Sequence, residues 1–97
     1  MAAYMIVLID MQSTDWIEGY VREVPAIMER YGGEYVAIGQ APEVVEGGMS
    51  PPSAVTLFRF PNVEAIKSFL GSEEYRPFKE MRAVASQAQI LAFESTI

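Results

Sequence analysis

The chain has 97 residues, 51% of them hydrophobic, and 13 acidic against seven basic side chains give it a net charge of −6. This length corresponds to one domain, which we assign to residues 1–97, and the apolar fraction is too high for a disordered chain. The sequence contains no cysteine and no histidine, which excludes disulfides, thiolate nucleophiles, imidazole bases and zinc sites built on those ligands.

The basic residues are scattered singly, so no stripe of positive charge is available to neutralise phosphates. No apolar run approaches the roughly 20 residues that cross a bilayer. The apolar residues at the start of the chain follow no Lys or Arg, and no small-residue cleavage pattern comes after them. We therefore expect a cytoplasmic protein that binds neither nucleic acid nor a membrane.

Residues 3–11 are almost all apolar, which predicts a strand that is covered on both faces. Asp10 stands at the end of this strand. A carboxylate in this position either caps the strand end or contributes to a site at the rim of the sheet.

Ser13, Thr14 and Asp15 are predicted N-caps of a helix. Apolar residues then follow at helical spacing and form one face, namely Trp16, Tyr20, Val24, Ile27 and Tyr31. Gly32 or Gly33 supplies the positive φ that commonly ends a helix. Tyr20 on this face is either a core or interface residue whose hydroxyl reaches the rim or a catalytic acid.

Residues 34–39 and 54–60 predict two further strands. Arg59 lies between two phenylalanines, and because an unpaired buried guanidinium is costly, it needs a salt bridge, an exposed edge position or a ligand anion. The long connection at residues 40–53 is typical of a lid, a ligand contact or a subunit contact.

Asn62 predicts the start of a helix that ends at Gly71, and Ser72 predicts the cap of a second helical piece. The buried stripe of that piece is predicted to contain Phe78, Met81 and Ala85, with Arg82 one residue away from it. Residues 89–94 predict the last strand.

The order strand, helix, strand, strand, helix, strand is the split βαβ plan of the α+β class. It places helices on one face of a four-stranded antiparallel sheet. Because the strands carry apolar residues on both faces, the second face also needs a cover, and an exposed patch of that kind marks an interaction surface. We predict that two copies pack sheet to sheet as a homodimer.

Several short motifs together resemble one family. They are Tyr20 with Val24-Pro25, Tyr31-Gly32-Gly33, Glu46-Gly47, Phe60-Pro61, Ser72 with Glu74-Tyr75, and Arg82. As a set they resemble the domain of unknown function numbered 1330 (DUF1330), a dimeric α/β barrel family, from about residue 3 to residue 94. The chain departs from the family pattern where Arg59 stands at a usually acidic position, and where Phe69-Leu70 replace a tryptophan and a tyrosine.

The resemblance implies a ferredoxin-like βαββαβ dimer with a cleft between each sheet and its helices. It implies Glu46, Tyr20 and Arg82 as catalytic candidates, with Glu46 as a base and Tyr20 as a hydroxyl donor, and Tyr75 as a substrate-binding candidate. The alternative for Glu46 is a turn with Gly47, and the alternative for Arg82 is an ion pair with a neighbouring acid. Asp10 and Arg59 join the binding candidates from the residue patterns alone. Because related barrels include monooxygenases and isomerases, one hypothesis is an enzyme that needs no cofactor and acts on a small apolar or aromatic metabolite. The alternatives are a non-catalytic binder of a small molecule and a structural homodimer.

Overall fold

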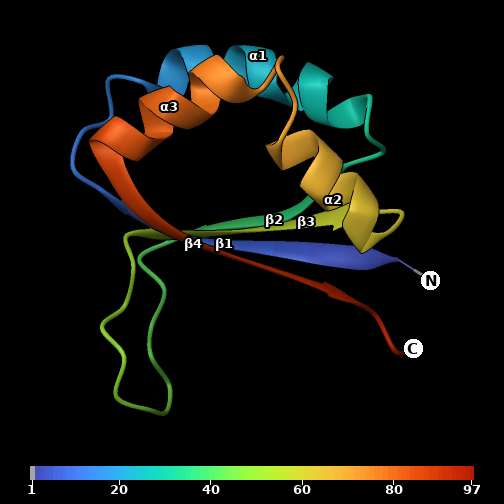
Figure 1. Ribbon diagram of the computed structural model, residues 1–97. Helices are drawn as coiled ribbons and strands as arrows, with labels where there is room; N and C mark the ends of the chain where they lie inside the picture. The colour runs from blue at the N-terminus through green and yellow to red at the C-terminus, as the bar shows by residue number, and fades with distance from the viewer. Residues whose placement is uncertain (1) are drawn as a thin grey trace.

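The structure, a computed structural model, describes residues 2–97 as a four-stranded antiparallel sheet with three helices on one of its faces (Figure 1). In chain order the elements are β1 (Ala3–Met11), α1 (Ile17–Glu29), β2 (Glu34–Gln40), β3 (Ala54–Phe60), α2 (Val63–Leu70), α3 (Arg76–Ala85) and β4 (Ser86–Glu94). This is the α+β, ferredoxin-like plan that the sequence predicts, with its second helical segment divided in two. No helix in residues 2–97 has the length and apolar character that crossing a membrane requires.

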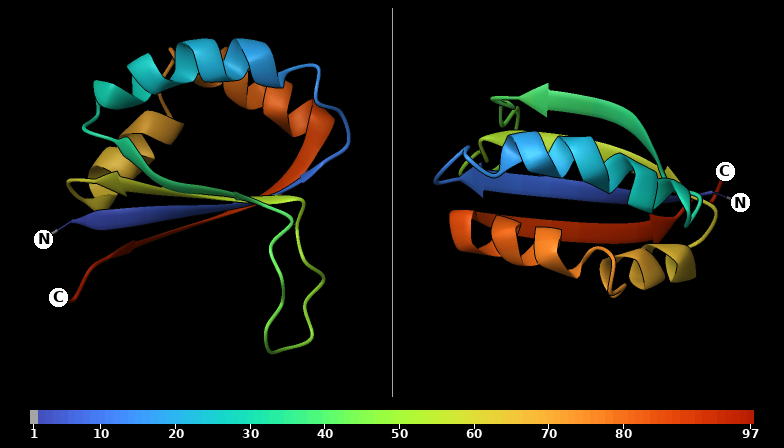
Figure 2. Two further views of the ribbon diagram at one scale, coloured as in Figure 1. Left: turned by 180° about the vertical axis from the view of Figure 1, so that it is seen from behind. Right: turned by 90° about the horizontal axis from the view of Figure 1, so that it is seen from above.

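The strands lie in the order β2-β3-β1-β4, so the apolar β1 is central. Met5 of β1 lies opposite Phe58 of β3 on one side and Ala92 of β4 on the other. Side chains alternate along each strand, so these residues share the face that the helices cover. Figure 2 shows that the helices cover this face of the sheet.

The start of α1 differs from the prediction. Trp16 occupies the cap position and makes no side-chain cap bond, so the predicted capping by Ser13, Thr14 or Asp15 is wrong. The chain makes a turn before the helix, and the Ile17 amide donates to the Thr14 carbonyl. A backbone carbonyl therefore satisfies a donor that a side-chain cap would otherwise take. At α2, by contrast, the Asn62 side chain accepts from the Ala65 amide, as predicted.

Two expectations for the end of the chain also need correction. β4 begins at Ser86 and not at residue 89, because it pairs with β1 as far as Met11 and continues directly from α3. On α3, Met81 is 42% exposed, whereas Arg82 lines the interior. Arg82 is four residues after the inward-facing Phe78 and so lies on the same side of the helix.

The core is concentrated where α2 meets the sheet. Phe60, Phe69 and Tyr75 are almost completely buried, and Phe69 packs against both of the others at ring-centroid distances of 5.8 and 4.5 Å. The turn between α1 and β2 closes over this cluster. Gly32 has a φ of +79°, as the sequence predicts for a helix end, and Gly33 follows with no room for a side chain.

The other face of the sheet has no helix over it in residues 2–97. Its centre is made of apolar side chains from three strands, namely Tyr4, Ile6, Leu8, Val55, Leu57, Leu91 and Phe93, which we call the open face. Leu91 and Phe93 are 56% and 47% exposed. The loop of residues 41–53 projects from the sheet on the side away from the helices (Figures 1 and 2). Within this protomer, the open face leaves large apolar surface in water.

We expect Gly33→Ala to destabilise the protein. A Cβ at this position would lie 2.5 Å from both Met28 Cγ and Phe60 Cζ. Forcing a carbon into a packed core typically costs about 1–3 kcal/mol. Urea denaturation measures the loss, with Gly48→Ala as the control because a Cβ there meets nothing within 4 Å. Equal stability of the two variants would contradict the described packing.

Candidate functional site

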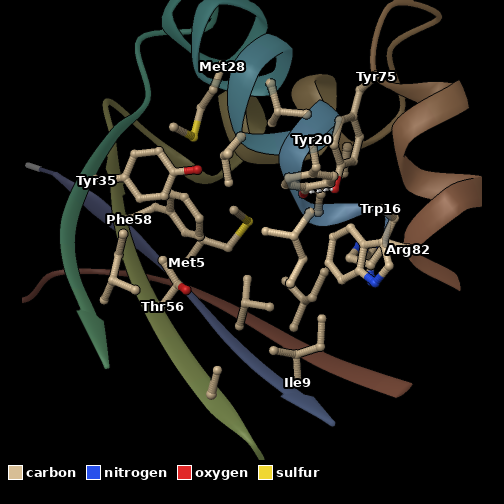
Figure 3. A pocket seen from close by; sticks show the side chains of 18 of the residues that line it. Met5, Ile9, Trp16, Tyr20, Met28, Tyr35, Thr56, Phe58, Tyr75 and Arg82 are labelled. Atoms are coloured by element: carbon tan, nitrogen blue, oxygen red, sulfur yellow. Dashed lines mark hydrogen bonds between the residues drawn. The ribbon is translucent and has the colours of Figure 1, made fainter. Parts of the chain in front are cut away.

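A cavity of about 210 Å³ lies between the helices and the sheet (Figure 3). Its floor comes from all four strands, and its roof from α1, α2 and α3 with the residues just before α1 and α3. Most lining side chains are apolar. The polar or aromatic-polar members of the lining are Trp16, Tyr20, Tyr35, Gln40, Thr56, Tyr75 and Arg82. This is the cleft between sheet and helices that the family resemblance implies.

The cavity exists because the sheet floor carries smaller side chains away from the aromatic core. Along β3 the inward side chains change from Phe60 and Phe58 to Thr56 and Ala54. α3, which lies above β4, has no buried residue of its own. Small side chains on the sheet and a helix without buried side chains leave a space that residues 2–97 do not fill.

Tyr20 and Tyr75 join two elements across the roof. Tyr20 is on α1 and Tyr75 immediately precedes α3, and their hydroxyl oxygens are 2.5 Å apart. One hydroxyl donates to the other, so the acceptor keeps an O–H that is free to donate to a bound molecule. Trp16 packs edge-on against Tyr20 with ring centroids 5.2 Å apart. The pair is therefore held rigidly at the cavity wall (Figure 3).

The surroundings of Tyr20 keep its phenol protonated. Burial raises the pKa of Tyr20 well above its ordinary value of 10.0, the neighbouring Tyr75 raises it further, and the charge of Arg82 opposes both effects. Burial likewise raises the pKa of Tyr35. Both phenols are hydrogen-bond donors at neutral pH, and neither is a ready base.

Arg82 enters the cavity from α3. Its Nε is buried and has no hydrogen-bond partner among residues 2–97. The guanidinium lies close enough to Tyr20 to lower the pKa of that phenol. No Asp or Glu is among the residues that line the cavity, so Arg82 is the one charged side chain in the described lining.

The other three sequence candidates lie elsewhere. Asp10 is exposed at the end of β1, where its carboxylate accepts from the Ser53 amide at 3.1 Å and holds the start of β3. Arg59 forms an ion pair with Glu34 of β2 and is 52% exposed, which is the salt-bridge interpretation of this residue. Glu46 is exposed in the loop of residues 41–53. The structure brings together Tyr20, Tyr75 and Arg82, and leaves these three outside the cavity lining.

Sequence reasoning did not propose Trp16, Tyr35 or Thr56 as site residues, although all three line the cavity. A signal existed for two of them. Trp16 shares the helical face of Tyr20, and Thr56 is the polar position on the inward face of β3, next to Phe58 and Phe60. In residues 2–97 no group of acidic side chains is arranged to hold a metal ion.

Solved structures with the same fold align with nearly the whole chain. A protein of unknown function from Rhodopseudomonas palustris is 18% identical, with a TM-score of 0.81 over 99% of this chain and 83% of that one. SnoaB, a cofactor-independent oxygenase from Streptomyces nogalater, is 13% identical, with a TM-score of 0.69 over 99% of this chain and 94% of that one. A dimeric ferredoxin-like protein of unknown function from Thermobifida fusca is 12% identical, with a TM-score of 0.66 over 98% and 92%.

These structural similarities establish the fold. The sequence identities are too low to assign the activity of any of these proteins to this chain. No curated protein matches the sequence significantly. The family comparison is more direct, because the match runs over residues 2–96. The chain therefore belongs to the DUF1330 family, a domain of unknown function.

Proposed function

We propose that the protein is a small enzyme that acts without a cofactor on an apolar or aromatic metabolite, in the manner of a monooxygenase or an isomerase. The observation that carries this proposal is the apolar cavity with the Tyr20–Tyr75 hydroxyl pair in its wall. An apolar pocket with a few convergent polar groups is the usual form of a small-molecule site. The fold shared with a cofactor-independent oxygenase supports the same class.

The geometry suits the stabilisation of negative charge on a substrate oxygen. A free O–H of the tyrosine pair can donate to a carbonyl or enol oxygen, and a donor held in place before reaction loses little energy in reorganisation. Trp16 and Tyr35 offer flat surfaces against which a ring can pack. In this proposal Tyr20 is the donor, and Tyr75 positions it.

A second candidate is a non-catalytic binder of the same molecules. The observation that favours it is that no carboxylate lines the cavity in residues 2–97, so the wall supplies no ready general base. A substrate in this cavity must arrive ionised or lose its proton to water. Turnover of a bound ligand separates the enzyme from the binder.

We also propose that two copies associate through the open face. Burial of its apolar side chains removes the surface that one protomer leaves in water. The chain is a single short domain, and such domains bury a small share of their surface when they fold alone. Three solved structures of the same fold are described as dimeric ferredoxin-like proteins, which supports this arrangement.

We expect small aromatic metabolites to raise the melting temperature of the protein in a thermal-shift screen. A ligand at 100 times its dissociation constant adds about 2.7 kcal/mol to the free energy of unfolding. Thr56→Phe should abolish this response, because the new ring would occupy the cavity floor. Mass spectrometry of the ligand after incubation under air detects turnover. A screen without hits, or equal hits with Thr56→Phe, would contradict the proposed site.

For a ligand that is converted, Tyr20→Phe should lower turnover about 100-fold, as loss of one preorganised donor does. The dissociation constant should change less than about tenfold, since a neutral hydrogen bond contributes about 0.5–1.5 kcal/mol. Tyr31→Phe is the matched control, because Tyr31 packs against the core at Phe69 and does not line the cavity. Binding without any product would assign the binder function instead.

We expect Leu91→Glu to convert a dimer into a monomer in sedimentation experiments at micromolar concentration. Leu91 lies opposite Ile6 on the open face, so the new carboxylate would be buried without a partner between two sheets. Val84→Glu is the control, because Val84 is 85% exposed on α3. A monomeric wild-type protein, or dissociation by both variants alike, would refute assembly through the open face.

A further inference from the structure

We infer that the ligand of this cavity is an aromatic molecule with a single acidic oxygen group, bound as its monoanion, with the negative charge at Arg82. This inference rests on the proposed function, because it concerns the same cavity, and it narrows the substrate to one chemical class. It combines the position of one guanidinium, the charge of the cavity wall and the size of the space.

Arg82 is in an unusual position for a cation. Its Nε is buried in the wall, and neither a hydrogen bond nor an ion pair to this side chain is found within residues 2–97. The other arginines of the chain form ion pairs with carboxylates near the surface, namely Arg22, Arg30, Arg59 and Arg76. A buried N–H donor without a partner is destabilising, so an anion that enters the cavity and accepts from Arg82 Nε gains a strong, charge-assisted hydrogen bond.

The charge of the cavity wall is balanced by a ligand that carries one negative charge. Arg82 is the one charged group in the described lining, and the rest of the wall is mostly apolar. A neutral ligand would leave the guanidinium unpaired, and a dianion would bring one charge that no cation meets. The monoanion is the form whose charge the site balances.

The size of the space limits the ligand to a small ring system. A cavity of about 150 Å³ is enough to hold benzene. The present volume of about 210 Å³ therefore holds one substituted ring or a compact fused pair. Tyr20 lies beside Arg82, so the O–H of the tyrosine pair can donate to the same acidic oxygen that the guanidinium meets.

The chromogenic compound 4-nitrophenol tests this inference directly, because its phenolate absorbs visible light and its phenol does not. At saturating protein, preferential binding of the anion lowers its apparent pKa, since an opposite charge favours the ionised form. We expect a decrease of about one unit, which corresponds to a tenfold preference for the phenolate. Titration of the absorbance against pH, with and without protein, measures the shift.

Arg82→Met should reverse the sign of the shift, because an apolar cavity without a cation prefers the neutral phenol. Lys79→Met is the matched control, since it removes a positive charge from the exposed side of the same helix and should leave the shift unchanged. An unchanged or raised pKa in the wild-type protein overturns the inference even if Arg82→Met does not fold. Binding with a raised pKa would still support the proposed cavity, whereas no binding at millimolar concentration would refute both.

Discussion

The aromatic contact between Phe69 and Tyr75 sets the height of the helices above the sheet. Phe69 reaches down from α2 to Phe60 on β3, and Tyr75 stacks on Phe69 with ring centroids 4.5 Å apart. The hydroxyl of Tyr75 then meets that of Tyr20, so α1 is fixed through the same column. Because three large rings separate the layers at one end, the smaller side chains at the other end cannot fill the gap. The cavity follows from this packing, and Tyr75 belongs both to the column of rings and to the polar part of the cavity wall.

The regular elements were predictable because their signals are local. The apolar run of residues 3–11 coincides with β1, and the alternation of residues 54–60 gives the observed faces of β3. The inward position of Arg82 was not predictable in the same way. The apolar helical stripe predicts that Met81 faces inward. Nothing in the sequence shows that α3 lies above a cavity with room for the Arg82 side chain. The position of Arg82 depends on the distance between the helices and the sheet, and packing between residues far apart in the sequence determines that distance.

The candidate site shows the same division between local and long-range information. Polar residues that stand out in the sequence, such as Asp10 and Arg59, make contacts at the sheet outside the cavity. Asp10 holds the start of β3, and Arg59 pairs with Glu34 on the neighbouring strand. The residues that line the cavity resemble ordinary core positions, because Tyr20 occurs in an apolar helical pattern and Tyr75 is almost completely buried. A tyrosine in such a pattern is partly a core residue, since its ring packs while its hydroxyl needs a partner. The family resemblance drew attention to this pair and to Arg82, where periodicity alone did not distinguish them.

The electrostatics of the cavity bear on the chemistry it can support. Burial keeps the phenol of Tyr20 protonated, and it also leaves the Nε of Arg82 without a hydrogen-bond partner among residues 2–97. Both effects come from the same low-dielectric surroundings, in which donors and cations act more strongly on an anion than they do in water. The wall therefore favours the ionised form of a bound acidic molecule without removing the proton itself. In an enzyme of this design the reactive electrons belong to the substrate, and the protein contributes the environment in which its anion persists.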